Sequence, residues 1–597
     1  MLNALYRYAV DHGLTVPQGY VKKTVKAYIL LTSDGRFVGI DMGDDVPLPC
    51  PDIGSMANSK DKSNVLVEKR SVVIPAQVSV KSRFFLAALE DGGRMEPMLA
   101  LCAAALRDAD CAAAIRAELD RMKVKDAGRI SFRVGGRSIL DSPQTDAWWQ
   151  TYRKQFLKGD GGAQEICLIT GEPTVPMATL PAINGLAIVG GNTAGSKLIC
   201  FDESAYRSYG LEKAANAPVS EEAFSAVKAA LDALLKDAPV LAGMKFVHWY
   251  DKPVKREEDT LSGIFDGFGF ELPEDAGDGP APVSEAAENA KADALVRSVY
   301  TGGQQAALAS EYYILLLTGV NGRVMIRRYE HGSYEELQRQ LNRWLDDISL
   351  QALGGRSMVR PHKLTGMMIR LMKRQRSDRN ILERLGKELA GVTPAVLKAI
   401  LSGRELPDSV AARALAYIRS QMLDSEDTTH APDAMACQWL KAWVRRREEQ
   451  QGEAVTMPYC NKNHPRPEYH CGRLVAVYTR IQQEAMPGVN AGIAERYYAS
   501  ASQTPALVLG TLGRMVNHHL AKIGNTDTVR WFENMLSEIN VAIGDAIPAT
   551  LTLEQQAYFA LGYRQQWAEM PLKHRSDAQS SADANKEADE EADETEE

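Results

Sequence analysis

The sequence predicts an α+β protein, with a mixed α/β N-terminal body that contains β-hairpins and an all-helical C-terminal bundle. Glycine turns separate strand-like apolar runs near residues 33–35 and 320–322, as in β-hairpins. After Arg356 the apolar residues recur at helical spacing instead. The length of 597 residues exceeds what one hydrophobic core serves, so we expect two to four domains.

The body is expected to span residues 1–355. Its second hairpin turns at Asn321 and Gly322, residue types that tolerate positive φ. Ser333 and Glu336 then have the spacing of a capping box, which predicts the start of a helix. Apolar residues follow at helical spacing and predict one buried face: Leu337, Leu341, Trp344, Leu345 and Ile348.

Composition shifts divide the rest of the chain. Residues 266–290 combine Gly, Pro and acids with little to bury, which predicts a mobile acidic loop. Residues 356–456 are expected to form a basic helical region, and residues 457–582 a helical bundle with a helix start at Thr504 and Pro505. Residues 583–597 hold nine acids and one Lys, which predicts a disordered tail.

The overall composition is that of a soluble globular protein, with 45% hydrophobic and 24% charged residues. No apolar run approaches the roughly 20 residues that a membrane span needs, so a cytoplasmic location is expected. Eight scattered cysteines fit reduced thiols. The net charge of −8 equals that of the acidic tail, so the remainder is close to neutral and a nucleic-acid partner stays compatible.

A glycine-rich loop, residues 190–197, lies in the most distinctive stretch of the chain. Strand-like apolar runs are predicted at 166–169, before the loop up to Val189, and after it at 198–201. Glycines allow close backbone approach, and successive N–H groups can bind an anion. The loop also offers side chains for nucleic-acid contact: Asn192, Thr193, Ser196 and Lys197. A tight turn that needs glycine for its geometry is the structural alternative.

A nucleotide-binding P-loop is a weaker interpretation of the same loop. Ser196 separates Gly195 from Lys197, no Ser or Thr follows the lysine to hold magnesium, and a strand-like run follows where a helix should begin. We found no metalloprotease, serine-hydrolase or helicase motif in the sequence. The chain is therefore predicted not to be an enzyme, and a nuclease or NTPase built on residues 190–197 is the alternative.

A second polar loop precedes the strand-like residues 65–74. Its amide and hydroxyl groups can read base edges and its lysines can contact phosphate, although an ordinary polar loop explains them as well. The candidate residues are Lys60, Lys62, Ser63 and Asn64.

A basic block lies between Gly354 and Arg404, where twelve Lys or Arg face three acids. Cations at this density repel one another unless a polyanion or acidic neighbours neutralise them, so they are candidates for contact with a phosphate backbone. A solvated helix face is the alternative. The methionines 367, 368 and 372 are predicted to pack in the core. The backbone candidates are Arg356, Arg360, Lys363, Arg370, Lys373, Arg374, Arg376 and Arg379.

Two histidine clusters are expected to be structural. Cys460, His464, His470 and Cys471 lie within twelve residues, but paired Cys-x-x-Cys ligands are missing and adjacent ligands fit a tetrahedral metal poorly. The pair at 518–519 lies in a helical pattern without a nucleophile nearby, so buried or interface histidines are predicted. No metal or other cofactor is expected.

Several blocks of sequence together resemble one family, the large subunit of the type I-C CRISPR surveillance complex. They occur in the family's order and span nearly the whole chain except the acidic tail. They are KAYILLTSDGRFVGID, the residues around 167–224, YYILLLTGVNGRVMIRRYEHGSYEELQRQLNRWLDDI, AILSGRELP, AYIRSQ, CGRLVAVYTRIQ, ERYYASASQTPALVLGTL, NHHLAKI and FALGYRQQ.

The resemblance implies a non-catalytic role. Proteins of this family join a CRISPR RNA, backbone subunits, a guide-end-binding subunit and small subunits, inspect double-stranded DNA for a protospacer-adjacent motif, help to form the R-loop and recruit a helicase-nuclease. The loops 58–64 and 190–197 then become candidates for motif recognition. A free transcription regulator is a further alternative, and it predicts tight sequence-specific DNA binding without RNA.

The resemblance also implies that the small subunit can arise by internal translation of the same gene. Met457 is the predicted start, because the codons for Gly452 and Glu453 can form a ribosome-binding sequence before it. Met435 and Met486 are the alternative starts.

Overall fold

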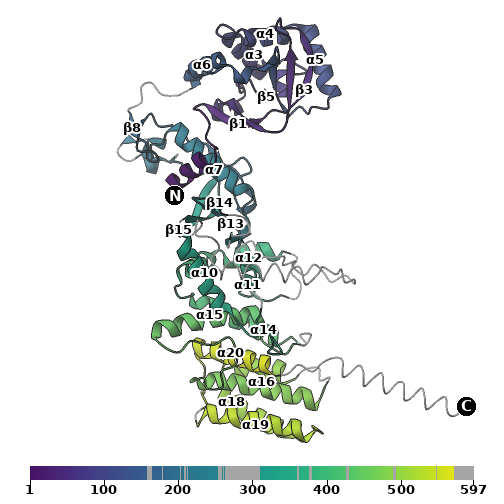
Figure 1. The fold of residues 1–597 in the computed structure, drawn as a ribbon, viewed down its shortest axis with the longest axis vertical. Helices are drawn as coiled ribbons and strands as arrows, with labels where there is room; N and C mark the ends of the chain where they lie inside the picture. Colours follow the sequence, from purple (N-terminus) through teal and green to yellow (C-terminus); the bar gives the residue numbers. More distant parts are fainter. Residues whose placement is uncertain are drawn as a thin grey trace, which may run out of the picture. The chain divides into compact units, whose positions relative to one another are not determined.

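The computed structural model describes residues 1–156, 164–262 and 310–570, with gaps at 178, 202, 208–209, 212, 253, 255–258, 260, 360–361, 376–379, 425–428, 488–491 and 546. The predicted acidic loop at 266–290 and the tail at 583–597 lie outside the described residues. The chain forms two compact units (Figure 1). Unit 1 holds Met1–Ala238 and Leu317–Ile326, and unit 2 holds Pro239–Leu316 and Arg327–Glu597. No helix among the described residues is long and apolar enough to cross a membrane.

A mixed sheet in the order β3-β2-β6-β5 forms the centre of the first part of unit 1. The first predicted hairpin is confirmed, because β2 and β3 pair antiparallel across a turn in which Gly35 has φ +88°. Strand β2 also pairs parallel with β6, which requires a long crossover connection. The strands are β2 (Ala27–Leu31), β3 (Phe37–Met42), β5 (Glu68–Lys69), β6 (Arg129–Val134) and β7 (Arg137–Ser138).

Helices cover one face of this sheet and a two-stranded ribbon covers part of the other. Ile29 and Phe132 pack in a core with residues of α3 and α4, whereas Tyr28 packs with Cys50 of β4. The alternation follows from the strand period of two. The elements are α2 (Arg70–Val73), α3 (Val80–Gly92), α4 (Pro97–Arg107), α5 (Ala109–Arg121) and α6 (Pro143–Tyr152), with ribbon strands β1 (Tyr20–Thr24) and β4 (Pro47–Pro51).

The second part of unit 1 has little regular structure apart from α1 (Leu2–Asp11) and α7 (Glu221–Lys236). The prediction of three strands around the glycine-rich loop is largely wrong. Only Ile166 of the first run is extended, the second run ends in a 3₁₀ turn, and residues 198–201 are irregular. The strands are β8 (Glu165–Ile166), β9 (Pro173–Thr174), β10 (Ala182–Ile183) and β11 (Ser196–Lys197). Two-residue strands are set by their tertiary partners, which periodicity does not report.

The second predicted hairpin is confirmed as β14 (Glu311–Val320) and β15 (Arg323–Ser333), with positive φ at Asn321 and Gly322. The tip of this hairpin belongs to unit 1 and its stem to unit 2, where β14 pairs with β13 (Met244–Tyr250) beside β12 (Val240–Leu241). Helix α10 (Tyr334–Ile348) follows, and its five predicted apolar residues are buried. Only half of the capping box forms: the Ser333 hydroxyl accepts the Glu336 N–H, while the Glu336 carboxylate bonds Gln340 and Arg339.

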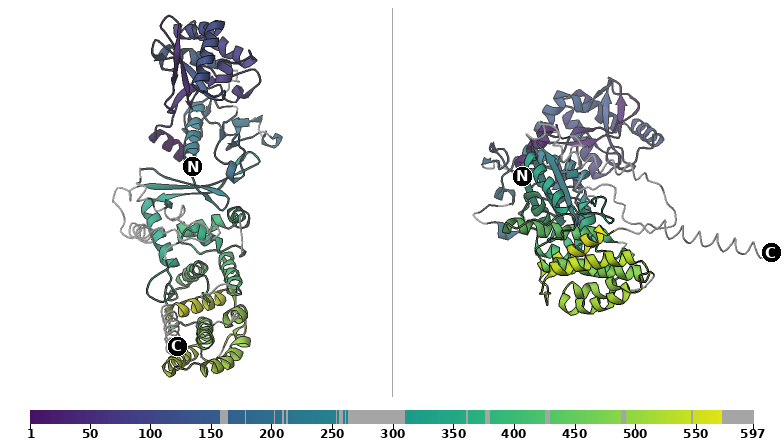
Figure 2. Two further views of the ribbon diagram at one scale, coloured as in Figure 1. Left: turned by 90° about the vertical axis from the view of Figure 1, so that its right-hand side faces the viewer. Right: turned by 60° about the horizontal axis from the view of Figure 1, so that its bottom comes forward.

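Unit 2 is helical from residue 364 to residue 569 in its described parts, as predicted (Figure 2). One hydrophobic core runs through it, from Leu241 to Met570. The helices are α11 (Leu364–Ile369), α12 (Ile381–Leu389), α13 (Thr393–Ser402), α14 (Asp408–Met422), α15 (Ala434–Gln451), α16 (Pro467–Ala485), α17 (Ile493–Ala501), α18 (Pro505–Leu520), α19 (Thr526–Ile543) and α20 (Leu553–Glu569).

The two most buried C-terminal helices, α16 and α20, touch through their backbones. A Cβ at Gly472 would lie 2.0 Å from the Phe559 carbonyl oxygen, and a Cβ at Gly562 would lie 2.0 Å from the Tyr469 carbonyl oxygen. Glycine is therefore required at both positions. Helix α18 begins at Pro505 as predicted, but the Thr504 hydroxyl donates to the Ser500 carbonyl instead of capping the helix.

Candidate nucleic-acid interface

The glycines of the loop 190–197 pack against the hairpin tip. A Cβ at Gly190 would lie 2.6 Å from the Gly319 carbonyl oxygen, and a Cβ at Gly319 would lie 2.1 Å from the Gly191 Cα. Gly190 and Gly195 also have positive φ, at +86° and +98°. The glycines therefore serve close packing and turn geometry, which was the structural alternative.

The backbone amides of this loop are used within the protein. The N–H of Gly191 donates to the Leu186 carbonyl at 2.8 Å, that of Gly195 to the Asn192 carbonyl at 3.0 Å, and that of Lys197 to the Gly322 carbonyl at 2.7 Å. The Asn192 N–H donates to the Ser196 hydroxyl, and the Ala194 N–H to the Asn192 side-chain oxygen. An anion cradle needs free N–H groups, and these five have internal acceptors.

The four candidate side chains of the loop differ in exposure. Asn192 and Thr193 are exposed and can meet a ligand. Ser196 is fully buried, and its hydroxyl accepts the backbone N–H of Asn192. Lys197 is half-buried, and its ammonium donates to the Leu180 carbonyl. Of the four predicted side chains of this loop, only Asn192 and Thr193 are exposed in this conformation.

Arg323 was missed by the sequence analysis. It pairs with Lys197 through a parallel bridge between β15 and β11, and its exposed side chain lies beside the loop, where it bonds Tyr206. The two positions are more than 100 residues apart, so no local pattern could have brought them together.

The N-terminal loop is likewise divided between surface and structural residues. Lys60 is exposed, and Lys62 lies 3.6 Å from the Asp61 carboxylate with 34% of its side chain exposed. Ser63 is fully buried and donates to the Lys81 carbonyl. Asn64 is half-buried, its side-chain oxygen accepts the Ile53 N–H, and its own N–H donates to Glu68.

Acidic neighbours neutralise part of the basic block. Arg370 lies 3.3 Å from Asp433, and Arg374 lies 2.7 Å from Asp424. Lys363 is half-buried, whereas Arg356 and Lys373 are exposed. The three methionines are buried, as predicted. Arg360, Arg376 and Arg379 lie outside the described residues.

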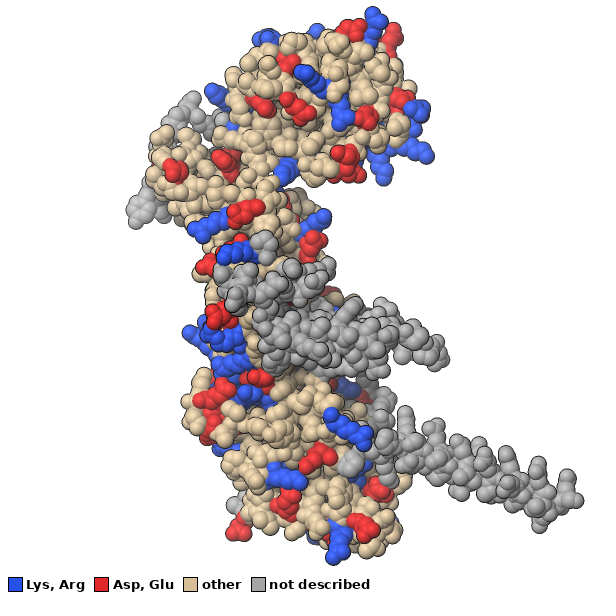
Figure 3. Space-filling view, in the orientation of Figure 1, with Lys and Arg blue, Asp and Glu red and all other residues tan. Residues whose placement is uncertain are grey.

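Other arginines of unit 2 also have acidic partners. On the face drawn in Figure 3, Lys and Arg gather beside α10. Arg339 of α10 pairs with Glu335 and Glu336, and Arg343 pairs with Glu449 of α15. This charge is locally compensated, so density of cations alone does not identify a polyanion site.

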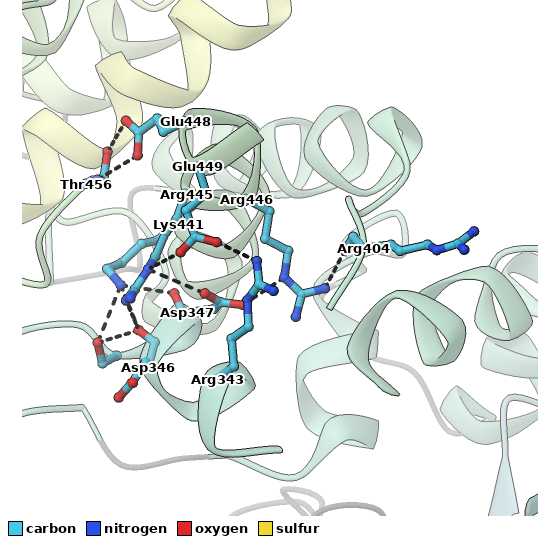
Figure 4. Close-up of polar contacts among 11 residues, drawn as sticks. Arg343, Asp346, Asp347, Arg404, Lys441, Arg445, Arg446, Glu448, Glu449 and Thr456 are labelled. Carbon is cyan, nitrogen blue, oxygen red and sulfur yellow. Dashed lines mark hydrogen bonds and ion pairs between the residues drawn. The ribbon is translucent and has the colours of Figure 1, made fainter. Parts of the chain in front are cut away.

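A buried ionic network joins α10, α13 and α15 (Figure 4). The Arg446 guanidinium is fully buried, lies 2.7 Å from the Asp347 carboxylate and donates to the Ala399 and Arg404 carbonyls. The Lys441 ammonium donates to the carbonyls of Asp346 and Asp347 at the end of α10. Burial lowers the pKa of Lys441 to about 8. Burial raises the pKa of the Asp347 carboxyl, which Arg446 opposes. These cations stabilise the helical region rather than bind a ligand.

The histidine cluster near residue 464 is a polar network of the core. His470 bonds the His464 carbonyl at 2.7 Å, and Arg473 donates to the other His470 ring nitrogen at 3.1 Å. His464 stacks on Tyr469 with ring centroids 4.2 Å apart. Within the described part of the chain, no group of three or more His, Cys, Asp or Glu could hold a metal ion. His519 is buried and His518 exposed.

A family model for a CRISPR-associated protein (Cas_Csd1) matches residues 2–570. The chain belongs to this family, which is that of the type I-C large subunit. Among curated proteins, none matches the sequence significantly. Membership implies a multi-subunit CRISPR complex of the Cascade type.

Proposed function

We propose that this CRISPR-associated chain is the non-catalytic large subunit of a type I-C RNA-guided complex. It inspects double-stranded DNA for a protospacer-adjacent motif, aids R-loop formation and recruits the helicase-nuclease, in company with the guide RNA, backbone, guide-end-binding and small subunits. Pairing with the guide supplies most sequence specificity, while the protein reads a short duplex motif. The proposal places the chain and these partners in the cytoplasm.

The observation that carries the proposal, beyond family membership, is the pair of rigidly held polar loops in unit 1. Internal hydrogen bonds fix the loop 190–197 and leave Asn192 and Thr193 exposed, and Lys60 is exposed on the other loop. Small side chains on a fixed backbone suit close approach to base edges, and the neighbouring Arg323 adds a donor for phosphate or guanine.

Asn192→Ala tests motif reading in the assembled complex. We expect binding to motif-bearing duplex to weaken by roughly 1 to 3 kcal/mol with little change on motif-free duplex. Asn3→Ala, at an exposed asparagine of α1, is the matched control. Equal loss on both duplexes would show that Asn192 only shapes its loop.

The absence of catalysis is part of the proposal. Internal acceptors for five loop amides and the structural bond of Lys197 support it over an NTPase. The purified chain should not turn over ATP or cut DNA in the presence of magnesium. Steady turnover that Lys197→Ala abolishes would reverse this conclusion.

For backbone contacts we select Arg356 and Lys373, which are the exposed residues among the described backbone candidates. Their charge reversal should weaken binding of every DNA sequence alike and flatten its salt dependence. An unchanged salt dependence would place the phosphate contacts elsewhere.

A further inference from the structure

Three cations lie in a row across neighbouring strands of the N-terminal sheet. Lys69 of β5 pairs directly with Arg129 of β6. Lys26 precedes β2, and its N–H donates to the Arg129 carbonyl at 2.7 Å. All three are exposed, and a turn closed by the Gly128 N–H and the Lys125 carbonyl brings the exposed Lys125 next to them. We call Lys26, Lys69, Lys125 and Arg129 the basic row.

The acidic residues around the basic row already pair with Lys26 or with Arg70. Asp45 pairs with Lys26, while Asp120 and Asp126 pair with Arg70. In the described part of unit 1, Lys69, Lys125 and Arg129 have no acidic group within 4.0 Å. Like charges directly opposite on paired strands destabilise a sheet, so this arrangement carries uncompensated repulsion.

Protection of a sheet edge does not explain the basic row. Lysine on an edge strand prevents edge-to-edge association, and β5 is an edge strand, so this reason would suffice for Lys69 alone. Strand β6, which supplies Arg129, lies inside the sheet order, and so does β2, which Lys26 directly precedes. The row therefore fits a polyanion that offers several phosphates in sequence.

The basic row adjoins the N-terminal polar loop. Glu68, the residue before Lys69, accepts the Asn64 N–H at 2.9 Å. We propose that Lys69, Lys125 and Arg129 bind successive backbone phosphates of the duplex DNA whose motif the polar loops read. The inference rests on the proposed function. Phosphate contacts set the position of a duplex without reading its sequence, so the row would hold the DNA in register against Lys60 and Asn64.

The test uses the assembled complex with its guide RNA and the double variant Lys69→Gln, Arg129→Gln. Affinity is measured for motif-bearing and motif-free duplex over a range of salt concentrations. We expect a roughly ten- to hundredfold loss at 0.1 M salt on both duplexes, and a slope of log K against log salt that is smaller by about 1.8. The control Arg36→Gln, Arg94→Gln removes the same charge from exposed cations that have acidic partners, and it should keep the slope.

Each outcome decides the inference. An unchanged slope overturns it, and so does a loss confined to motif-bearing duplex, which indicates base reading. Loss of guide RNA from the complex with unchanged duplex binding assigns the row to RNA and also overturns it. If the double variant does not assemble, Lys125→Gln alone must reduce the slope by about 0.9. A wild-type complex without motif preference would refute the proposed function, whereas an unchanged slope beside an intact preference would refute the basic row alone.

Discussion

The buried ion pair between Arg446 and Asp347 shows what a single charged residue does in this protein. Both side chains are fully buried, and Arg446 also satisfies two backbone carbonyls of neighbouring segments. Removing Arg446 leaves the buried Asp347 with the more distant Arg445 alone, which costs more than losing an exposed pair. In the sequence, Arg446 stands in a run of three arginines that looks like a solvated helix face.

Arg446→Met is expected to lower the free energy of unfolding by about 3–5 kcal/mol, because it removes the nearer cation of the buried Asp347 and leaves only Arg445, 3.5 Å from the carboxylate. The double variant Asp347→Leu, Arg446→Met should recover much of that loss. Arg339→Met, at an exposed ion pair of α10, should change stability by about 1 kcal/mol or less. Urea unfolding of unit 2 measures all three, and equal losses for Arg446→Met and Arg339→Met would contradict the buried pair.

His464 makes stability depend on pH. Burial lowers its pKa to about 4, with His470 and Arg466 adding to the shift. An unfolded histidine binds a proton below about pH 6.5. Between pH 6.5 and about pH 4 the unfolded chain therefore binds a proton at this residue and the folded chain does not. Stability is therefore full above pH 6.5 and falls as the pH drops to about 4, by about 3 kcal/mol.

The variant His464→Asn isolates this effect. Its side-chain oxygen can replace the ring nitrogen that accepts the Arg466 N–H, but it does not titrate. Wild type and variant are unfolded with urea at pH 7.5 and pH 5. Relative to the wild type, the variant should be more stable at pH 5 than it is at pH 7.5. If the difference in unfolding free energy between the two proteins is the same at both pH values, His464 does not cause the pH dependence.

Residue types predicted the candidate interface, but burial selected among them. Asn192, Thr193 and Lys60 reach the surface, whereas Ser63 and Ser196 bond the backbone inside. A hydroxyl serves either role, and sequence alone does not distinguish them. Basic residues raised the same difficulty, since Arg370 and Arg374 meet acids 50 or more positions away.

At the scale of elements, prediction succeeded where the local pattern was long. Both glycine hairpins and the amphipathic α10 form as predicted, because turn chemistry and helical periodicity are contained in the segment itself. The strands around the glycine-rich loop were mispredicted because only two residues of each strand form pairs, and one of these strands, β11, pairs with β15 over 100 residues later. The packing of α16 on α20 was equally hidden, because it depends on two glycines 90 positions apart.

Gly472→Ala tests that helix contact. The new Cβ meets the Phe559 carbonyl oxygen, so the helices must separate, and we expect a loss of about 1–3 kcal/mol in unfolding free energy. Gly510→Ala in α18 is the matched control, because nothing lies within 4 Å of its Cβ. That change should stabilise the helix by about 0.5–1 kcal/mol. Gains of equal size at both sites would show that helix propensity, not contact, governs them.

At the scale of the whole molecule, the C-terminal bundle shares its core with the helices before it. Tyr558 donates to Glu448 of α15, Tyr563 to the His430 carbonyl, and Glu495 pairs with His430. A product that starts at Met457 loses these partners but keeps α16–α20. A start at Met486 would remove α16, whose closely packed partner is α20, and leave no bundle core. A start at Met435 would retain Glu448 with α15.

We predict a separate product of about 140 residues that begins at Met457, because the codons for Gly452 and Glu453 can form a ribosome-binding sequence before it, and that joins the complex beside the full chain. Met457 is 38% exposed and contributes only its carbonyl, which accepts a bond from Gln565, so Met457→Leu should leave the full-length fold intact. Expression with a C-terminal tag and blotting should show the short species in wild type and its loss in the variant. Persistence of a species of about 160 residues would assign the start to Met435, and absence of any short species from wild type would refute internal translation.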